Sequence, residues 1–436
     1  MSEIYGIDLG TTNSLLGLHG ELLTGLVPSV VDLQTSRAGV SELENMSAVR
    51  SFKVDISLFK EGDISRSASA RVLRQLVIES GRDVKDVVIS VPAYFSDNQR
   101  QATIKAATLA GLNVRGLVNE PTAAAIYASK ERRALSLVFD LGGGTFDVSV
   151  VDSRLGDYDV QATDGCVLGG DDFDDALRKH VIKAAGIKVH HLTKELIMKL
   201  KWECSKLKIK LQKERAPVDI DLTDYGAGVY TLTPDIYQEI MRDTFFPVIQ
   251  KTKSVIGEAI PHNEKYDLLF VGGSTRCPYL REWVEAELGK KAVDMFYDPD
   301  RIVALGATLY AQMVEEGTID LSVSDVTKAL AIGLSDGTSR IIIARNSKIP
   351  VEETTVVYNH SESDKLALTL YQGDSYLSKD NEMIGQLIYP YGRMVPPEEG
   401  EVIVGIKVDA DGTIHFYCKE LLKPQVEITL DRRSLA

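Results

Sequence analysis

Residues 135–152, LSLVFDLGGGTFDVSVVD, contain the pattern on which the rest of this sequence depends. An apolar run ends in Asp140, three glycines follow, and alternating apolar residues begin again at Phe146. This pattern predicts a strand, a glycine turn and a second strand. Consecutive glycines let backbone N–H groups curl around an anion. Asp140 and Asp147 would put two carboxylates beside that anion, an arrangement that suits a metal ion bound together with it. The alternative is an ordinary tight hairpin with acidic flanks.

The same pattern occurs at the start of the chain. Residues 4–18, IYGIDLGTTNSLLGL, contain an apolar strand, Asp8, Gly10, the hydroxyl pair Thr11 and Thr12, and a second apolar strand. Two phosphate hairpins far apart in the sequence indicate two duplicated halves that face one nucleotide. A Walker P-loop is excluded because no lysine follows the glycines, and a dinucleotide fingerprint is excluded because a strand stands where its helix should begin.

The composition limits the classes of protein to consider. A chain of 436 residues exceeds the usual size of one hydrophobic core, so two or more domains are expected. A net charge of −14 argues against a general nucleic-acid or membrane-surface role, because both targets are anionic. The sequence shows no secretory leader at its start and no apolar run of bilayer length. Its four cysteines have no C-x-x-C spacing, which favours free thiols in a reducing cytoplasm.

Predicted strands and helices alternate through most of the chain. Residues 87–91 predict a short strand, a helix follows from its cap at Ser96, and a strand at 114–118 leads to a helix that begins near Glu120. By pattern alone, a carboxylate at a helix start most often complements the helix dipole. The acidic cluster 171–175 lacks EF-hand spacing and is interpreted as a solvated helix start.

A third glycine turn, GGSTR at 272–276, follows a predicted strand at 266–271 and opens a helix. Glycines in this position let a ligand approach the backbone closely and face the helix N-terminus. Alone, the motif is weak evidence for a binding site. In a chain with two phosphate hairpins, it fits the nucleoside end of the nucleotide that those hairpins would bind. In the helix predicted over 300–310, Gly306 indicates close packing with a neighbour.

The alternation stops near Gly317, and short strands separated by turn residues follow from Ala329 onward. The predicted strands are at 341–344, 355–358, 366–371, 402–408 and 414–418. They indicate an all-β second domain, interpreted as a sandwich. Leu366 and Leu368 project from one face of their strand, and core packing is the simplest explanation of that pattern.

With both hairpins, VPAYFSDNQRQAT at 91–103, NEPTAAA at 119–125 and VGGSTR at 271–276, the chain resembles the heat shock protein 70 (DnaK-like) chaperone family. Within that family it is most similar to the short HscC-type members. The resemblance implies an α/β actin-like ATPase domain, with two lobes of a duplicated ribonuclease H-like fold, followed by an all-β peptide-binding sandwich. The implied domains are 1–317 for the ATPase, 318–326 for the linker and 327–436 for a sandwich without the family's helical lid.

The resemblance also implies a function. The chain is expected to be a cytoplasmic, ATP-dependent molecular chaperone and ATPase that binds extended hydrophobic peptide segments. Mg²⁺ and ATP or ADP are the expected cofactors, and hydrolysis would control peptide binding and release. One alternative is an actin-like ATPase with a scaffolding or regulatory role and little chaperone turnover. Another is a sugar or acetate kinase, but the sequence shows no second substrate pocket.

The resemblance also implies which residues of this sequence form the site, because the family's functional residues match positions here. The resemblance assigns the metal to Asp8 and Asp140, and catalysis to Lys53 (with Lys60 as the fallback), Glu120, Thr145 and Asp147. It assigns the phosphates to Gly10, Thr11, Thr12, Asn13, Gly142, Gly143, Gly144 and Thr145. It assigns the nucleoside to Glu203, Lys206, Gly272, Gly273, Ser274 and Arg276, with the guanidinium over the adenine face.

Further positions match residues outside the nucleotide site. Pro92, Arg100 and Asp325 match residues that relay the nucleotide state to the linker, and Leu366 and Leu368 match the peptide cleft. Gly116 stands where the family has an arginine used by J-domain partners, which puts that partnership in doubt. The ATPase domain is short where exchange factors normally bind, so that partner is also uncertain.

Overall fold

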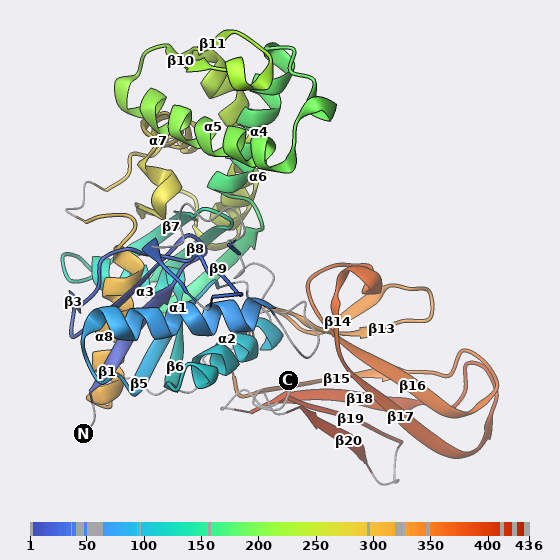
Figure 1. The fold of residues 1–436 in the computed structure, drawn as a ribbon. Coiled ribbons are helices and arrows are strands. Elements are labelled where there is room, and N and C mark those ends of the chain that lie inside the picture. Colours follow the sequence, from blue (N-terminus) through green and yellow to red (C-terminus); the bar gives the residue numbers. More distant parts are fainter. Residues whose placement is uncertain are drawn as a thin grey trace. The chain divides into compact units, whose positions relative to one another are not determined.

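The computed structural model describes residues 3–35, 37–40, 48–49, 64–93, 95, 97–155, 158–293, 297–318, 326, 328–345, 347, 349–409, 414–420 and 425–430 (Figure 1). Lys53, Lys60 and Asp325 lie outside the described residues. The contacts between Cα atoms divide the chain into two units. One unit is Met1–Ala93 with Lys105–Ile319, and the other is Tyr94–Ile104 with Asp320–Ala436.

The first unit contains two sheets built on the same strand pattern. In one the order is β3-β2-β1-β5-β6, with β4 on β2, and in the other it is β12-β7-β8-β9. The strands are β1 (Ile4–Leu9), β2 (Asn13–Leu18), β3 (Glu21–Leu22), β4 (Val27–Pro28), β5 (Asp86–Val91), β6 (Asn113–Asn119), β7 (Leu135–Leu141), β8 (Phe146–Asp152), β9 (Asp159–Cys166) and β12 (Asp267–Val271). Each sheet begins with a hairpin, β1–β2 or β7–β8, whose first strand also pairs with a parallel strand, β5 or β12. The expected duplication of the two halves is therefore present in the topology.

Two helices pack against both sheets, α3 (Glu120–Ala128) and α8 (Ile302–Glu315). Their backbones approach so closely that a Cβ atom at Gly306 would overlap the carbonyl group of Ala123. A Cβ atom at Gly6 on β1 would likewise overlap the backbone of Thr308 on α8. The close packing predicted from Gly306 is confirmed.

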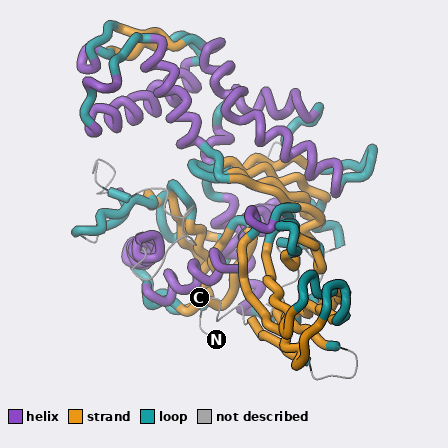
Figure 2. Tube along the Cα trace, turned by 90° about the vertical axis from the view of Figure 1, so that its right-hand side faces the viewer, coloured by secondary structure: helices purple, strands orange, loops and turns teal. Residues whose placement is uncertain are grey.

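Other helices surround these sheets. In the N-terminal half, α1 (Ile64–Ser80) packs against a core that includes β1, β2 and β5. Helix α2 (Asp97–Leu109) is divided between the two units at Ile104 and Lys105. A second group consists of α4 (Gly170–Ala184), α5 (Lys194–Glu214), α6 (Pro234–Ala259) and α7 (Pro278–Leu288), with the small sheet β10 (Val218–Asp221) and β11 (Val229–Leu232). Their shared core includes Phe173, Leu207 and Tyr237. Figure 2 shows the helices of this group together with their small pair of strands. No helix within the described ranges has the length and apolarity needed to span a bilayer.

The second unit contains two four-stranded antiparallel sheets, ordered β14-β13-β16-β17 and β15-β18-β19-β20. The strands are β13 (Leu330–Gly333), β14 (Ser339–Ile343), β15 (Val351–Val357), β16 (Ser363–Gln372), β17 (Glu382–Val395), β18 (Val402–Val408), β19 (Ile414–Lys419) and β20 (Val426–Leu430). Apolar side chains from both sheets form one core, among them Leu370 and Ile406. This arrangement is the sandwich expected for the second domain.

Candidate functional site

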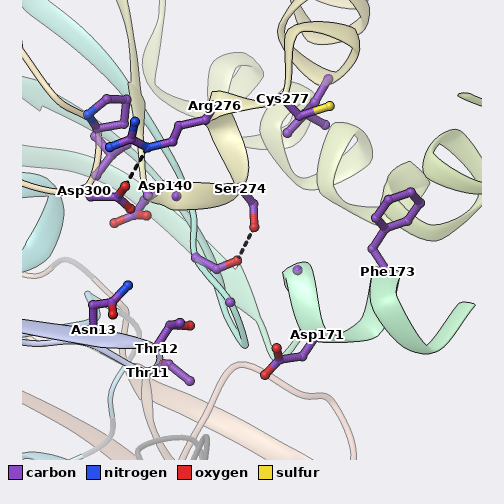
Figure 3. A pocket seen from close by; sticks show the side chains of 18 of the residues that line it. Thr11, Thr12, Asn13, Asp140, Asp171, Phe173, Ser274, Arg276, Cys277 and Asp300 are labelled. Carbon is purple, nitrogen blue, oxygen red and sulfur yellow. Dashed lines mark hydrogen bonds and ion pairs between the residues drawn. The ribbon is translucent and has the colours of Figure 1, made fainter. Parts of the chain in front are cut away.

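The first unit contains a cavity of about 640 Å³ between its hairpin turns and the helices α4, α5 and α6. Its polar end is lined by the turn at 10–13 and by Gly142, Gly143 and Thr145, and its apolar end by Phe173, Met241 and Phe245. In Figure 3, Thr11, Thr12 and Asn13 lie on one side of this space, and Phe173 and Cys277 lie on another. A cavity with one polar and one aromatic end suits a ligand that has a charged group and a flat ring.

The turns of the two hairpins touch each other at the polar end. A Cβ atom at Gly143 would overlap the hydroxyl group of Thr12, so only glycine allows this approach. Each turn is held by its own hydrogen bond. The Gly142 N–H donates to the Thr145 carbonyl at 3.0 Å, and the Ser29 hydroxyl donates to the Gly10 carbonyl at 2.7 Å. The two glycine motifs predicted to face one ligand do line one cavity.

The carboxylates of Asp8, Glu120 and Asp140 are among the six acidic side chains that line the cavity. The Ser90 hydroxyl donates to Asp8 Oδ1 at 2.7 Å and so fixes the orientation of that carboxylate. Glu120 is 7% exposed, although it begins helix α3. Asp147 is buried on β8, directly opposite Asp140 in the antiparallel ladder. Like charges in that position repel each other, and a cation beside them would relieve the repulsion.

The third glycine turn lies beside the second hairpin. Gly272 has φ +82°, and a Cβ atom there would lie 2.5 Å from Asp140 Oδ1. The turn continues into a short 3₁₀ helix, η4 (Gly273–Arg276), before α7 begins. The Ser274 hydroxyl donates to the Gly142 carbonyl at 2.8 Å, which links the two turns (Figure 3).

Arg276 projects along the cavity wall from the end of η4. Its Nε donates to Asp300 Oδ2 at 2.6 Å (Figure 3). Its terminal nitrogen is paired with Asp298. The side chain is 49% exposed, so the two aspartates hold the planar guanidinium in place while a face stays accessible. This geometry suits stacking on a flat ring.

One wall of the cavity is formed by helix α5, through Ser205, Lys208, Ile209 and Gln212. These positions are spaced i, i+3, i+4 and i+7 and therefore share one face of the helix. The sequence assigned Glu203 and Lys206 to the nucleoside, and neither residue lines this wall.

Glu203 and Lys206 are absent from the cavity wall and have other contacts. Glu203 accepts a hydrogen bond from the Tyr225 hydroxyl at 2.8 Å, and Lys206 Nζ lies 3.1 Å from the centroid of the Trp202 ring. The physical reason is the helical period, because a shift of two residues turns a side chain by about 200° around the axis.

An ion pair that the sequence did not reveal links α4 to α5. Lys208 Nζ lies 2.6 Å from Asp174 Oδ1, and Asp174 is 7% exposed. Burial raises the pKa of Asp174, and the neighbouring Lys208 lowers it only in part. The acidic cluster 171–175 does begin a helix, but the interpretation of that start as solvated is wrong for Asp174. A strictly local pattern could not show that its partner lies on another helix.

The remaining predicted residues within the described ranges have contacts of their own. Pro92 follows β5, and Arg100 on α2 donates from its Nε to the Phe95 carbonyl at 3.3 Å. On β16, Leu368 is 5% exposed within the core of the sandwich, and Leu366 is half-buried and packs against that core. The structure therefore puts both leucines on the inner face of β16.

Comparison with known proteins gives consistent results. The family model described as Hsp70 protein matches residues 40–432. Chaperone protein DnaK of Mycoplasmoides gallisepticum is 30% identical, and the alignment covers 96% of this chain and 78% of the relative. Heat shock 70 kDa protein of Neurospora crassa is 31% identical over 88% of this chain and 63% of the relative. Chaperone protein DnaK of Mycoplasmopsis pulmonis is 30% identical over 99% of this chain and 79% of the relative.

These matches confirm the expected fold class, an actin-like α/β ATPase domain followed by a β-sandwich. They also confirm the expected activities, ATP hydrolysis and ATP-dependent chaperone function, and they do not favour the scaffolding alternative. Because the family model matches most of its length, the chain belongs to the Hsp70 family.

Proposed function

We propose that the cavity of the first unit binds and hydrolyses Mg–ATP, and that hydrolysis controls the binding of extended apolar peptides by the β-sandwich. The observation that carries this proposal is the contact between Thr12 and Gly143, which joins the turns of two hairpins around one cavity. Turns of this kind present backbone N–H groups that suit phosphate oxygens. We assign the phosphates to Gly10, Thr11, Thr12, Asn13, Gly142, Gly143, Gly144 and Thr145.

We assign Mg²⁺ to Asp8 and Asp140. The donor set fits this ion, because Mg²⁺ usually keeps several waters and takes one or two carboxylates together with phosphate oxygens. When bound, the ion neutralises phosphate charge. The hydrogen bond from Ser90 orients the Asp8 carboxylate, and the proximity of Asp147 makes a positive charge near Asp140 favourable.

Hydrolysis depends on residues that position the reacting groups, because phosphoryl transfer needs orientation and charge stabilisation more than covalent chemistry. We assign Glu120 and Asp147 to orienting the attacking water, and Thr145 to the terminal phosphate. Glu120 is buried at a helix start, which limits its freedom and suits such a role. Lys53, or else Lys60, is proposed as the catalytic lysine.

The nucleoside is assigned to the wall formed by α5 and η4. Ser205 and Lys208 take the place that the sequence gave to Glu203 and Lys206, because they line the cavity. Gly272, Gly273 and Ser274 would lie along the sugar and base, and Arg276 would stack on the base.

The peptide is assigned to the β-sandwich. Leu366 is half-buried and within reach of the surface, whereas Leu368 becomes available only if strands around β16 part. A peptide that adds apolar contacts there would favour the state in which these strands are parted. Relay of the nucleotide state to the sandwich is assigned to Pro92, Arg100 and Asp325. A J-domain partner is left out of this proposal, because Gly116, which lies on β6 opposite Val88, has no side chain where the family has an arginine that such partners use. We also propose a cytoplasmic location, in keeping with four free cysteines.

Peptide affinity measured in ATP and in ADP tests the proposal. We expect ATP to weaken the binding of an apolar peptide, and peptide to weaken the binding of ATP by the same factor, because the coupling of binding free energies is reciprocal. We also expect peptide to stimulate hydrolysis. Asp140→Ala and Thr145→Ala should each lower turnover by about 100-fold or more while the protein stays folded. Asp219→Ala is the control, since Asp219 is exposed and bonds to Thr231 on β11. Normal turnover in Asp140→Ala would show the site to be wrong, and equal peptide affinity in both nucleotides would refute the chaperone cycle.

A further inference from the structure

The N-terminal turn of α4 lies against the glycine turn of the second hairpin, and the proposal above gives it no role. The Gly170 N–H donates to the Gly142 carbonyl at 3.0 Å, and the Asp171 N–H donates to the Gly143 carbonyl at 2.7 Å. The first N–H groups of a helix have no partner within that helix, so α4 satisfies two of them on the turn. The Ser274 hydroxyl also donates to the Gly142 carbonyl, which leaves that oxygen no lone pair for another group (Figure 3).

These bonds determine the direction of two N–H groups in the turn. In a trans peptide the carbonyl and the following N–H point in opposite directions, so the N–H groups of Gly143 and Gly144 are turned away from α4. Gly143 lines the cavity. Among the described residues, neither N–H donates to a protein group. Two adjacent backbone N–H groups without protein acceptors suit the oxygens of a phosphate.

The approach of α4 to the turn depends on Gly169 and Asp172. Gly169 has φ −160°, an extended conformation that any residue adopts, yet a Cβ atom there would lie 2.4 Å from the Gly143 carbonyl oxygen. The glycine is therefore needed for space and not for its backbone conformation. Asp172 Oδ2 accepts a hydrogen bond from the Gly169 N–H at 2.8 Å, which holds the first turn of α4 in this conformation.

We propose that Gly169 and Asp172 are positioning residues for the phosphates of the nucleotide. They hold the first turn of α4 against the hairpin and so keep the N–H groups of Gly143 and Gly144 directed at the ligand. Neither Gly169 nor Asp172 is part of the wall of the described cavity, so each acts through the turn and not on the nucleotide itself. The inference rests on the proposed function and deepens it, because it names residues outside the cavity wall on which phosphate affinity depends.

Substitutions of Asp172 separate positioning from charge, because the two effects predict opposite results. Asp172 is exposed, and loss of its negative charge alone would strengthen the binding of an anion. Asp172→Asn removes the charge but keeps an oxygen that accepts from the Gly169 N–H, so it should bind ADP at least as tightly as the wild type. Asp172→Ala also removes the acceptor and should bind ADP about fivefold more weakly than the wild type, as the loss of a capping side chain implies.

Gly169→Ala tests the approach of the two backbones. It should weaken ADP binding about tenfold or more, because its Cβ atom displaces the Gly143 peptide. Gly228→Ala is the matched control, since a Cβ atom there would meet nothing within 4 Å, and it should leave the affinity unchanged. Adenosine has no phosphate and should bind each variant as it binds the wild type, whereas a general loss of structure would weaken both ligands.

Titration calorimetry with ADP and with adenosine on the full chain measures these affinities without depending on turnover. If Gly169→Ala does not fold, the comparison of Asp172→Ala with Asp172→Asn decides alone. Equal ADP affinities in those two variants, or a loss of adenosine binding as large as the loss of ADP binding, would overturn the inference and leave the proposed function intact. If the wild-type protein binds no ADP, the proposed function itself fails.

Discussion

Lys206 and Lys208 are two residues apart on α5, yet only Lys208 lines the cavity. The buried carboxylate of Asp174 holds the Lys208 ammonium at the wall. Lys206 is exposed and lies over the ring of Trp202. A nucleotide bound in the cavity would therefore meet the charge of Lys208 and not that of Lys206.

We predict that Lys208→Ala weakens ADP binding about tenfold or more, because a hydrogen bond to a charged group contributes roughly 1.5–3 kcal/mol. Lys206→Ala is the matched control and should change the affinity less than twofold. Titration calorimetry measures both. Thermal unfolding should be recorded alongside, because Lys208→Ala leaves Asp174 buried without its lysine and lowers stability. Equal affinities in the two variants would contradict the cavity wall described here.

These two lysines also show how far single residues could be predicted. Asp8, Thr12 and Gly143 stand in continuous motifs whose strand, turn and strand fix the position of each side chain, and all three do line the cavity. On α5 there is no such turn to set the register, and an offset of two residues reverses the face of a helix. The pairing of Asp174 with Lys208 joins two helices and has no local signal at all.

The packing of α3 against α8 supports the site at the scale of whole elements. The start of α3 carries Glu120, and α8 contacts both α3 and β1, the strand that carries Asp8. Gly306 allows this because its missing side chain leaves room for the carbonyl of Ala123. Any side chain at this position must push the two helices apart.

We predict that Gly306→Ala lowers the free energy of unfolding by about 1–3 kcal/mol, despite the better helix propensity of alanine. The matched control is Gly257→Ala on α6, where a Cβ atom would meet nothing within 4 Å and φ is not positive. That variant should be as stable as the wild type or gain up to about 1 kcal/mol. Denaturant unfolding measures both, and a Gly306→Ala protein as stable as Gly257→Ala would refute the close packing.

Most elements of the first unit followed from their sequence patterns, but part of the sandwich did not. β17 was not predicted, although it is the longest described strand of that unit. It contains Gly385, Pro390 and Gly392, residues that normally interrupt a strand. Its pairing with β16, which includes register shifts, compensates for them. Tertiary pairing thus overrode local propensity there.

At the scale of the whole molecule, the nucleotide and the peptide are assigned to different units. Each unit has its own buried core, and the described cavity is lined by the first unit alone. An ATP-dependent chaperone nevertheless needs the two assigned sites to affect each other. Coupling requires that ATP and ADP favour different states of the sandwich, because a ligand shifts an equilibrium only by its differential affinity.

Hydrogen exchange on the full chain can separate binding from coupling. We predict that both ADP and ATP slow exchange in the hairpins β1–β2 and β7–β8, because both nucleotides place phosphates against those turns. In the sandwich, β16 and β17 should exchange faster with ATP than with ADP, since the ATP state is the one expected to release peptide. Thr145→Ala, which should slow hydrolysis, keeps ATP intact during the measurement. Protection of the hairpins by both nucleotides with no difference in β16 and β17 would mean that this chain binds nucleotide without controlling its sandwich.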